Sequence, residues 1–256
     1  MNRTDVPMPA SLPMLACLPM YDWPEVQAET TAYWDRVRAG ALAHAPGIDL
    51  PDTLTTPDWE AVAALWHDPA LVFSQTCWGP LSLGLIDRLL PLAQPDYTGI
   101  AGGRDRFYRS ALIARDGTAD PVPATPSASL PEAGLKGRIF AFNALDSLSG
   151  YIGLAQDLGV DPCAQALGCV ETGGHRASVR AVAEGRADLA AIDCRSWALA
   201  QRYEPCARRL TVIGWTSERL GLPYVTSRAT DPRTAQALRQ SLISMGCHPA
   251  PEGRDE

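Results

Sequence analysis

Strand-like apolar stretches alternate with helical patterns along nearly all of the 256 residues, and this alternation restricts the fold more than any other feature. We predict strands at residues 15–20, 71–73, 89–93, 107–114, 137–143, 169–172, 189–192, 210–215 and 222–226. We predict helices at residues 26–42, 59–66, 81–90, 152–158, 176–185, 197–203 and 232–245. Such alternation favours α/β layers with mostly parallel sheets.

The stretch at residues 140–151, with the sequence FAFNALDSLSGY, predicts a buried strand, a polar turn and the start of a helix. The first N–H groups of a helix lack internal partners and carry partial positive charge from the helix dipole. Together with the hydroxyls of Ser147 and Ser149, they form a pocket for a small oxyanion. Asp146 or Ser147 could instead simply cap the helix, and on this stretch alone capping is the better interpretation.

Polar side chains also follow four other predicted strands. They are Tyr21, the pair Gln75 and Thr76, His175, and Asp193. In open α/β sheets, ligands bind outside the carboxyl ends of the strands. We therefore expect these side chains to converge with the two serines, which shifts the interpretation from capping towards binding.

Composition and motifs exclude several kinds of partner. The net charge of −7 argues against a general nucleic-acid-binding surface. No apolar run approaches the roughly 18–20 residues that span a membrane. Residues 1–13 are proline-rich, are predicted to be disordered, and contain no convincing secretory signal, so the chain as given is predicted to be cytoplasmic unless a leader precedes it. Zinc motifs, a P-loop and Gly-x-Gly-x-x-Gly are absent, so we predict no metal and no cofactor.

The seven cysteines are spread singly, and their odd number argues against a complete disulfide framework. No pair has the two-residue spacing of a zinc or redox motif. Free buried thiols are the default expectation. A bridge between Cys163 and Cys169, or between Cys194 and Cys206, stays open at this point.

Three segments together resemble the phosphate/phosphite/phosphonate-binding proteins of bacterial ABC importers. They are SLSGY at residues 147–151, HRAS at residues 175–178 and VAEGRADLAAID at residues 182–193. The resemblance spans roughly residues 15–245. It implies a type II periplasmic-binding-protein fold, in which two α/β lobes are joined by a hinge around a central ligand cleft. Residues 14–98 plus 206–250 would form lobe one, and residues 104–202 would form the inserted lobe two.

The resemblance also implies roles for individual residues. The hydroxyls of Ser147 and Ser149, the N–H groups of Ser149, Gly150 and Tyr151, and the imidazole of His175 would bind a phosphorus oxyanion. Leu148 belongs to the same loop, and Gly150 would let the ligand approach the backbone closely. Asp193 either caps the next helix or accepts a hydrogen bond from a protonated phosphonate or phosphate, which sulfate cannot give. Tyr21, Gln75 and Thr76 would contribute from lobe one or serve as structural loop residues.

The resemblance implies a non-enzymatic solute-binding protein that is periplasmic and delivers a small oxyanion to an ABC permease. Two alternatives stay open. The first is a cytoplasmic ligand sensor on the same fold. The second is a hydrolase, because Ser149, His175 and Asp193 are the residue types of a Ser-His-Asp triad. The hydrolase is disfavoured because the chain has no Gly-x-Ser-x-Gly nucleophile motif.

Overall fold

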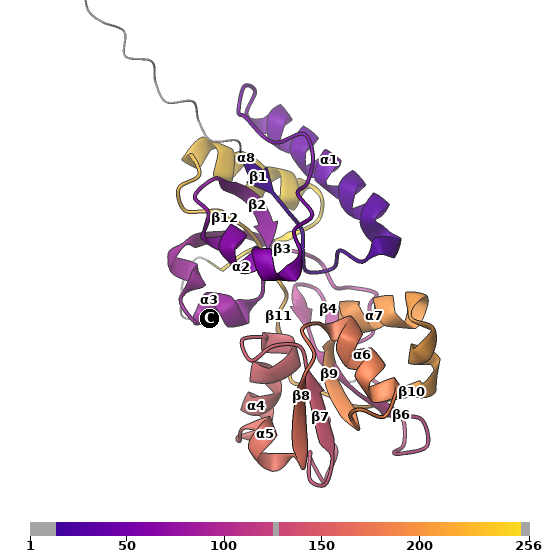
Figure 1. Cartoon of the computed structure of the whole chain (residues 1–256). Coiled ribbons are helices and arrows are strands. Elements are labelled where there is room, and N and C mark those ends of the chain that lie inside the picture. Colours follow the sequence, from indigo (N-terminus) through magenta and orange to yellow (C-terminus); the bar gives the residue numbers. More distant parts are fainter. Residues whose placement is uncertain (1–13, 125–127, 252–256) are drawn as a thin grey trace, which may run out of the picture.

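The computed structural model describes residues 14–124 and 128–251, and the tail predicted to be disordered lies outside them. The described chain forms two lobes, one above the other in Figure 1, and each lobe contains a five-stranded sheet. Within these residues, no helix is both long and apolar enough to cross a membrane.

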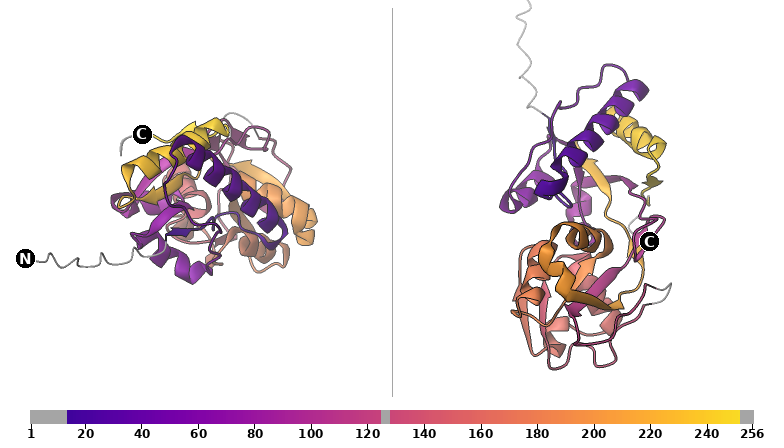
Figure 2. Two further views of the ribbon diagram at one scale, coloured as in Figure 1. Left: turned by 90° about the horizontal axis from the view of Figure 1, so that it is seen from above. Right: turned by 90° about the vertical axis from the view of Figure 1, so that its right-hand side faces the viewer.

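The first lobe is built around the sheet β1-β2-β12-β3-β13. Its elements are β1 (Leu15–Ala16), η1 (Pro24–Val26), α1 (Gln27–His44), α2 (Trp59–His67), β2 (Leu71–Gln75), α3 (Trp78–Ser82), η2 (Leu85–Asp87), β3 (Leu89–Gln94), β12 (Tyr224–Ser227), α8 (Pro232–Ser244) and β13 (His248–Pro249). Helices α1 and α8 pack side by side on this sheet (Figure 2). The Phe73 ring stacks between Trp34 and Tyr224, with centroid distances of 5.1 and 5.6 Å, and anchors the core.

The second lobe is built around the sheet β10-β6-β9-β7-β8. Its elements are β6 (Ser110–Arg115), β7 (Ile139–Phe142), η3 (Leu148–Ile152), α4 (Gly153–Leu158), α5 (Pro162–Gln165), β8 (Gly168–Glu171), α6 (His175–Ala183), β9 (Leu189–Asp193), α7 (Cys194–Tyr203), η4 (Pro205–Arg209) and β10 (Leu210–Trp215). The core side chains of β6, β7 and β9 are buried, as their continuous apolar sequences predict.

The two segments that run between the lobes pair with each other. In a small three-stranded sheet, β11 (Arg219–Leu220) lies antiparallel to β5 (Phe107–Tyr108), and β5 lies antiparallel to β4 (Gly103–Arg104). The expected division placed residues 206–250 in lobe one. In the structure, β10 pairs with β6 of the second lobe, so the chain leaves that lobe only after Trp215.

The alternation of strands and helices predicted mostly parallel sheets. In the structure, both five-stranded sheets are mixed. The strands that follow a crossing between lobes enter antiparallel: β12 runs against β2 and β3, and β6 runs against β9. The helix predicted at residues 81–90 is also wrong. Gly84, with φ +117°, follows the single turn of α3; the chain then continues in η2, which contains Leu85, and in β3, which contains Leu89 and Leu90.

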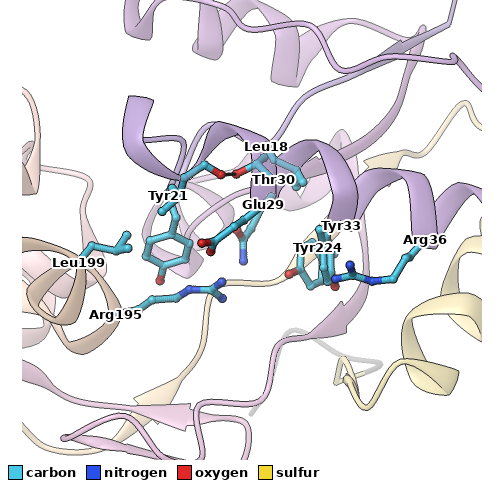
Figure 3. A pocket seen from close by; sticks show the side chains of 11 residues that line it. Leu18, Tyr21, Glu29, Thr30, Tyr33, Arg36, Arg195, Leu199 and Tyr224 are labelled. Carbon is cyan, nitrogen blue, oxygen red and sulfur yellow. Dashed lines mark hydrogen bonds between the residues drawn. The ribbon is translucent and has the colours of Figure 1, made fainter. Parts of the chain in front are cut away.

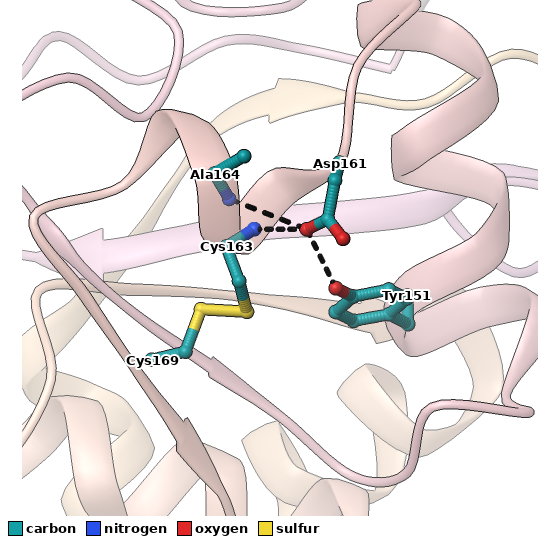
Figure 4. The surroundings of a disulfide bond; sticks show 5 residues. All are labelled: Tyr151, Asp161, Cys163, Ala164 and Cys169. Carbon is teal, nitrogen blue, oxygen red and sulfur yellow. Dashed lines mark hydrogen bonds between the residues drawn. A yellow bond between two sulfur atoms is a disulfide. The ribbon is translucent and has the colours of Figure 1, made fainter.

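A disulfide joins Cys163 in α5 to Cys169 in β8, whereas Cys194 and Cys206 are free thiols. Beside it, Asp161 caps α5 by accepting hydrogen bonds from the Cys163 and Ala164 amides (Figure 4). The bridge closes a short loop between a helix and an edge strand of the second sheet.

Candidate functional site

The turn after β7 is held by Ser147. Its Oγ accepts a hydrogen bond from the Gly150 amide at 3.0 Å, and its carbonyl accepts from the amides of Tyr151 and Ile152. These bonds make η3 a π-helical turn, a rare form that often occurs at functional sites. Ser147 is therefore a cap. The N–H groups of Gly150 and Tyr151, which we expected to face a ligand, are already bonded within the turn.

The thiol of Cys77, which comes from the other lobe, lies close to the amides of Leu148 and Ser149. Cys77 is buried, and this burial raises the pKa of its thiol, while the Leu148 and Ser149 amides act in the opposite direction. Of the three amides expected to bind a ligand, only that of Ser149 lies here, beside the Leu148 amide, which was not predicted.

The other residues of this turn contact the protein itself. A Cβ on Gly150 would lie 1.8 Å from Oδ1 of Asn143. We had expected the missing side chain to make room for a ligand, but in the structure it makes room for Asn143. The Tyr151 ring packs on Phe142 at 4.8 Å between centroids, and its hydroxyl donates to Asp161 (Figure 4). The Leu148 side chain packs against the core.

Ser149, His175 and Asp193 meet in one buried cluster. Ser149 Oγ lies 2.8 Å from Nε2 of His175, and the same nitrogen lies 3.3 Å from Oδ2 of Asp193. Ser149 and Asp193 are only 4% and 1% exposed. Burial lowers the pKa of His175, and the nearby Asp193 carboxylate acts in the opposite direction. The three residues, predicted from separate strands, are brought together as expected.

Asp193 caps a helix, which is one of the two roles expected for it. Oδ1 caps α7 by accepting from the amides of Arg195 and Ser196 at 3.1 and 3.0 Å. The same oxygen accepts from the hydroxyl of Tyr21 at 3.1 Å, whereas Oδ2 faces His175. A carboxylate buried with this many donors is held in one orientation.

Tyrosine hydroxyls from the first lobe and the hinge complete the cluster. The hydroxyls of Tyr21 and Tyr97 are 3.2 Å apart, and that of Tyr97 accepts from the Leu222 amide. Burial raises the pKa of both phenols, and the Asp193 charge adds to this effect. Tyr108 lies next to Tyr97, and its buried hydroxyl has no hydrogen-bond partner among the described residues.

Tyr97 and Tyr108 were not among the predicted site residues. Both lie in the segment that leads out of the first lobe: Tyr97 lies between β3 and β4, outside every predicted element, and Tyr108 lies in β5, within the strand predicted at residues 107–114. Hinge residues of a two-lobed protein lie at the floor of the cleft, so this position was the available signal. Phenol side chains there supply donors that need no positive charge.

Gln75 and Thr76 mainly fix the loop at the end of β2. Gln75 donates to the Leu222 carbonyl at 3.1 Å, and the Thr76 amide donates to the Pro223 carbonyl at 3.1 Å. The buried Thr76 hydroxyl has no partner among the described residues, and Gln75 lines the pocket described below. The structure thus brings Tyr21 into the cluster, whereas Gln75 and Thr76 bond to the backbone of Leu222 and Pro223, just before β12.

The lobes touch at two further points around the cluster. Arg176 of α6 bonds to Glu25 of the first lobe at 2.7 Å and to Glu204 of its own lobe at 2.9 Å, and its guanidinium lies 4.4 Å from the Trp23 ring. On the other side, Gly79 of α3 meets the turn before η3, where an added Cβ would lie 1.8 Å from the Asp146 carbonyl oxygen.

A pocket of about 210 Å³ opens between the lobes beside the cluster (Figure 3). The first lobe contributes most of its wall and the second contributes Arg195 and Leu199 from α7. Tyr21 belongs to both features, since its ring lines the pocket and its hydroxyl bonds to Asp193.

Comparisons with known proteins agree on the fold. PhnD1 from Prochlorococcus marinus, solved with methylphosphonate, has a TM-score of 0.61 at 15% identity, with 90% of this chain and 82% of that chain covered. A binding protein component of an ABC phosphonate transporter from Pseudomonas aeruginosa has a TM-score of 0.59 at 17% identity, covering 93% and 80%. A histidine kinase sensor domain with similarity to periplasmic binding proteins has a TM-score of 0.60 at 14% identity, covering 91% of each chain.

These similarities confirm the predicted two-lobed type II fold. No curated protein matches the chain. The family model described as the periplasmic substrate-binding protein of phosphonate ABC transporters matches residues 85–255, which is well over half of the sequence. The match includes the three segments on which the resemblance was based. The chain therefore belongs to the family of phosphonate ABC transporter substrate-binding proteins.

Proposed function

We propose that the protein binds a small phosphorus oxyanion between its lobes, as the solute-binding component of an ABC importer. The observation that carries this proposal is the buried cluster of Ser149, His175 and Asp193, which is closed from the other lobe by Tyr21. Family membership supports it, as does the shared fold with a methylphosphonate-bound protein.

The donors of the cluster suit a phosphonate group. The Ser149 hydroxyl, the His175 imidazole, the tyrosine hydroxyls and the first two amides of η3 can all donate to phosphoryl oxygens. The unpartnered Tyr108 hydroxyl provides one more donor from the hinge. Entry of an anion displaces the Cys77 thiol from the amides and replaces contacts within the protein by contacts with the ligand.

Asp193 supports selectivity for a protonated ligand. Its Oδ2 faces the cluster, so a phosphonate or hydrogen phosphate that carries a proton can donate to it. Sulfate carries no proton at neutral pH and would leave the buried carboxylate facing a second anion. The protein is therefore expected to reject sulfate.

The arrangement of the imidazole argues against the hydrolase alternative. In a catalytic triad, the serine and the carboxylate contact opposite ring nitrogens, so that one nitrogen takes the proton while the other is held. Here Ser149 and Asp193 both meet Nε2 of His175, and Nδ1 is buried with no partner among the described residues. We infer that the three residues bind a ligand and do not catalyse a reaction.

The disulfide supports an oxidising compartment, because such bonds persist in the periplasm and are rare in the cytosol. We propose that the protein works in the periplasm and that its closed form docks on a membrane permease. A second candidate is a sensor module, which the similarity to a histidine kinase sensor domain favours. Stimulation of permease ATPase activity by the purified, ligand-loaded chain distinguishes the two.

Isothermal titration calorimetry tests the binding proposal directly. Methylphosphonate, 2-aminoethylphosphonate, phosphite and phosphate are titrated into the protein, with sulfate as the negative control. We expect at least one of the phosphorus ligands to bind and sulfate to give no heat. If none of them binds, or if sulfate binds equally well, the proposed function is wrong.

A further inference from the structure

The pocket between the lobes adjoins the proposed phosphonate cluster and is built differently from it. Besides Tyr21, its walls include the rings of Tyr33 and Tyr224 from the first lobe and the side chain of Gln75. Arg195 extends into it from α7 of the second lobe, towards Tyr224 (Figure 3). A ligand group that enters this space touches both lobes at once.

Arg195 is the unusual group in this pocket. Its guanidinium lies 4.8 Å from the centroid of the Tyr21 ring, and none of the ion pairs between described residues involves it. Two other arginines near the contact between the lobes differ, since Arg176 pairs with Glu25 at 2.7 Å and Arg219 pairs with Asp157 at 2.8 Å. A half-buried guanidinium that faces a cavity is poised to accept an anion from outside.

The backbone connects this cation to the phosphonate cluster. The amide of Arg195 donates to Oδ1 of Asp193, so the carboxylate of the cluster and the guanidinium of the pocket start from the same turn of α7. Tyr21 separates the two spaces, with its hydroxyl on Asp193 and its ring under the guanidinium. A ligand with its phosphorus group in the cluster and a short chain passing Tyr21 reaches Arg195.

The charges around the pocket favour an anionic second group. Glu29 and Arg36 also line the space, but both are exposed, and the Arg36 guanidinium rests 5.7 Å from the centroid of the Tyr33 ring. Exposed charges are screened by solvent, whereas a cation among buried aromatic rings is screened much less. Arg195 therefore dominates the inner end of the pocket.

We propose that this pocket receives the second group of a two-headed phosphorus ligand, and that this group is a carboxylate or similar oxyanion bound by Arg195. The proposal rests on the proposed function, because it takes the phosphorus group to occupy the adjacent cluster. It narrows the ligand class from simple phosphonates to phosphonates that carry a carboxylate. The bidentate geometry of guanidinium and carboxylate makes this pairing selective.

Calorimetry with three probes tests it. Phosphonoacetate carries a carboxylate, methylphosphonate carries no second group, and 2-aminoethylphosphonate carries a cation. Loss of a hydrogen bond to a charged group weakens binding by about 10- to 150-fold. We expect phosphonoacetate to bind wild-type protein at least about tenfold more tightly than methylphosphonate. We expect Arg195→Gln to remove this difference and to leave methylphosphonate affinity within about twofold.

Two variants serve as controls. Arg195→Lys keeps the charge without the bidentate fork and should retain part of the preference. Arg202→Gln removes an exposed arginine from the last turn of the same helix and should change neither affinity. Equal melting temperatures for Arg195→Gln and wild type exclude a folding defect.

The outcomes separate this inference from the proposed function. Binding of methylphosphonate without any preference for phosphonoacetate overturns the role of Arg195 and leaves the phosphonate site standing. The same holds if 2-aminoethylphosphonate binds most tightly, or if Arg195→Gln weakens all three probes equally. Absence of binding by every probe overturns both proposals together.

Discussion

Removing the Ser149 hydroxyl gives the sharpest test of the proposed site. In the structure, this hydroxyl lies 2.8 Å from Nε2 of His175, Ser149 is 4% exposed, and the proposed function makes the hydroxyl a donor to the ligand. A hydrogen bond to a charged group contributes about 1.5–3 kcal/mol. We therefore expect Ser149→Ala to raise the Kd for methylphosphonate by about 10- to 150-fold in a calorimetric titration.

Ser147→Ala is the matched comparison, because Ser147 is the cap of the same turn. Its Oγ bonds to the Gly150 amide at 3.0 Å, and loss of a cap of this kind costs about 1 kcal/mol of folding free energy. For a chain of this size, that lowers Tm by about 2–4 °C. Ser149→Ala keeps the cap and should melt closer to wild type. The reasoning is refuted if Ser149→Ala binds like wild type, or if Ser147→Ala has the larger effect on affinity.

Three further predictions follow from charges and bonds around the site. Burial lowers the pKa of His175 in the folded protein, so its contribution to stability is complete above the unfolded pKa of about 6.5 and is lost as pH falls towards the lower folded value. Melting of wild type and His175→Gln across this range should therefore converge at the acidic end, and parallel pH curves contradict the assignment. Glu25→Gln removes the ion pair with Arg176 between the lobes, so it should weaken ligand binding several-fold. Glu184→Gln breaks an exposed ion pair within one lobe and should leave the affinity unchanged. Equal effects of the two variants on the affinity contradict the prediction. Thiol titration of the denatured, unreduced protein should miss the two cysteines of the bridge between Cys163 and Cys169, and seven reactive thiols would disprove it.

Much of the site was predictable because its residues occupy positions with a fixed meaning in α/β proteins. Ser149, His175 and Asp193 each follow a strand of the second sheet, and parallel neighbours such as β7 and β9 bring their ends together. The convergence of these side chains therefore depends on topology that the order of elements already contains. The distances between individual atoms, in contrast, cannot be predicted from the order of elements.

The errors have local physical causes. The leucine-rich sequence at residues 81–90 supports a helix or a strand equally well, and the decision depended on one glycine with positive φ. The role of Gly150 was misassigned because its constraint comes from Asn143, a neighbour that the turn brings close. Tyr97 and Tyr108 were missed because no periodic pattern marks a residue whose surroundings are supplied by both lobes.

Gly79 has a consequence for how the molecule could be studied. A methyl group there would lie 1.8 Å from the Asp146 carbonyl oxygen and 2.9 Å from the Leu148 amide nitrogen, both of which belong to the opposite lobe. A single alanine at this position is therefore expected to hold the two lobes apart, while the side chains of Ser149, His175 and Asp193 stay chemically unchanged. Such a variant would represent the open state. The difference between its ligand affinity and that of the wild type would measure how much closure of the lobes contributes to binding.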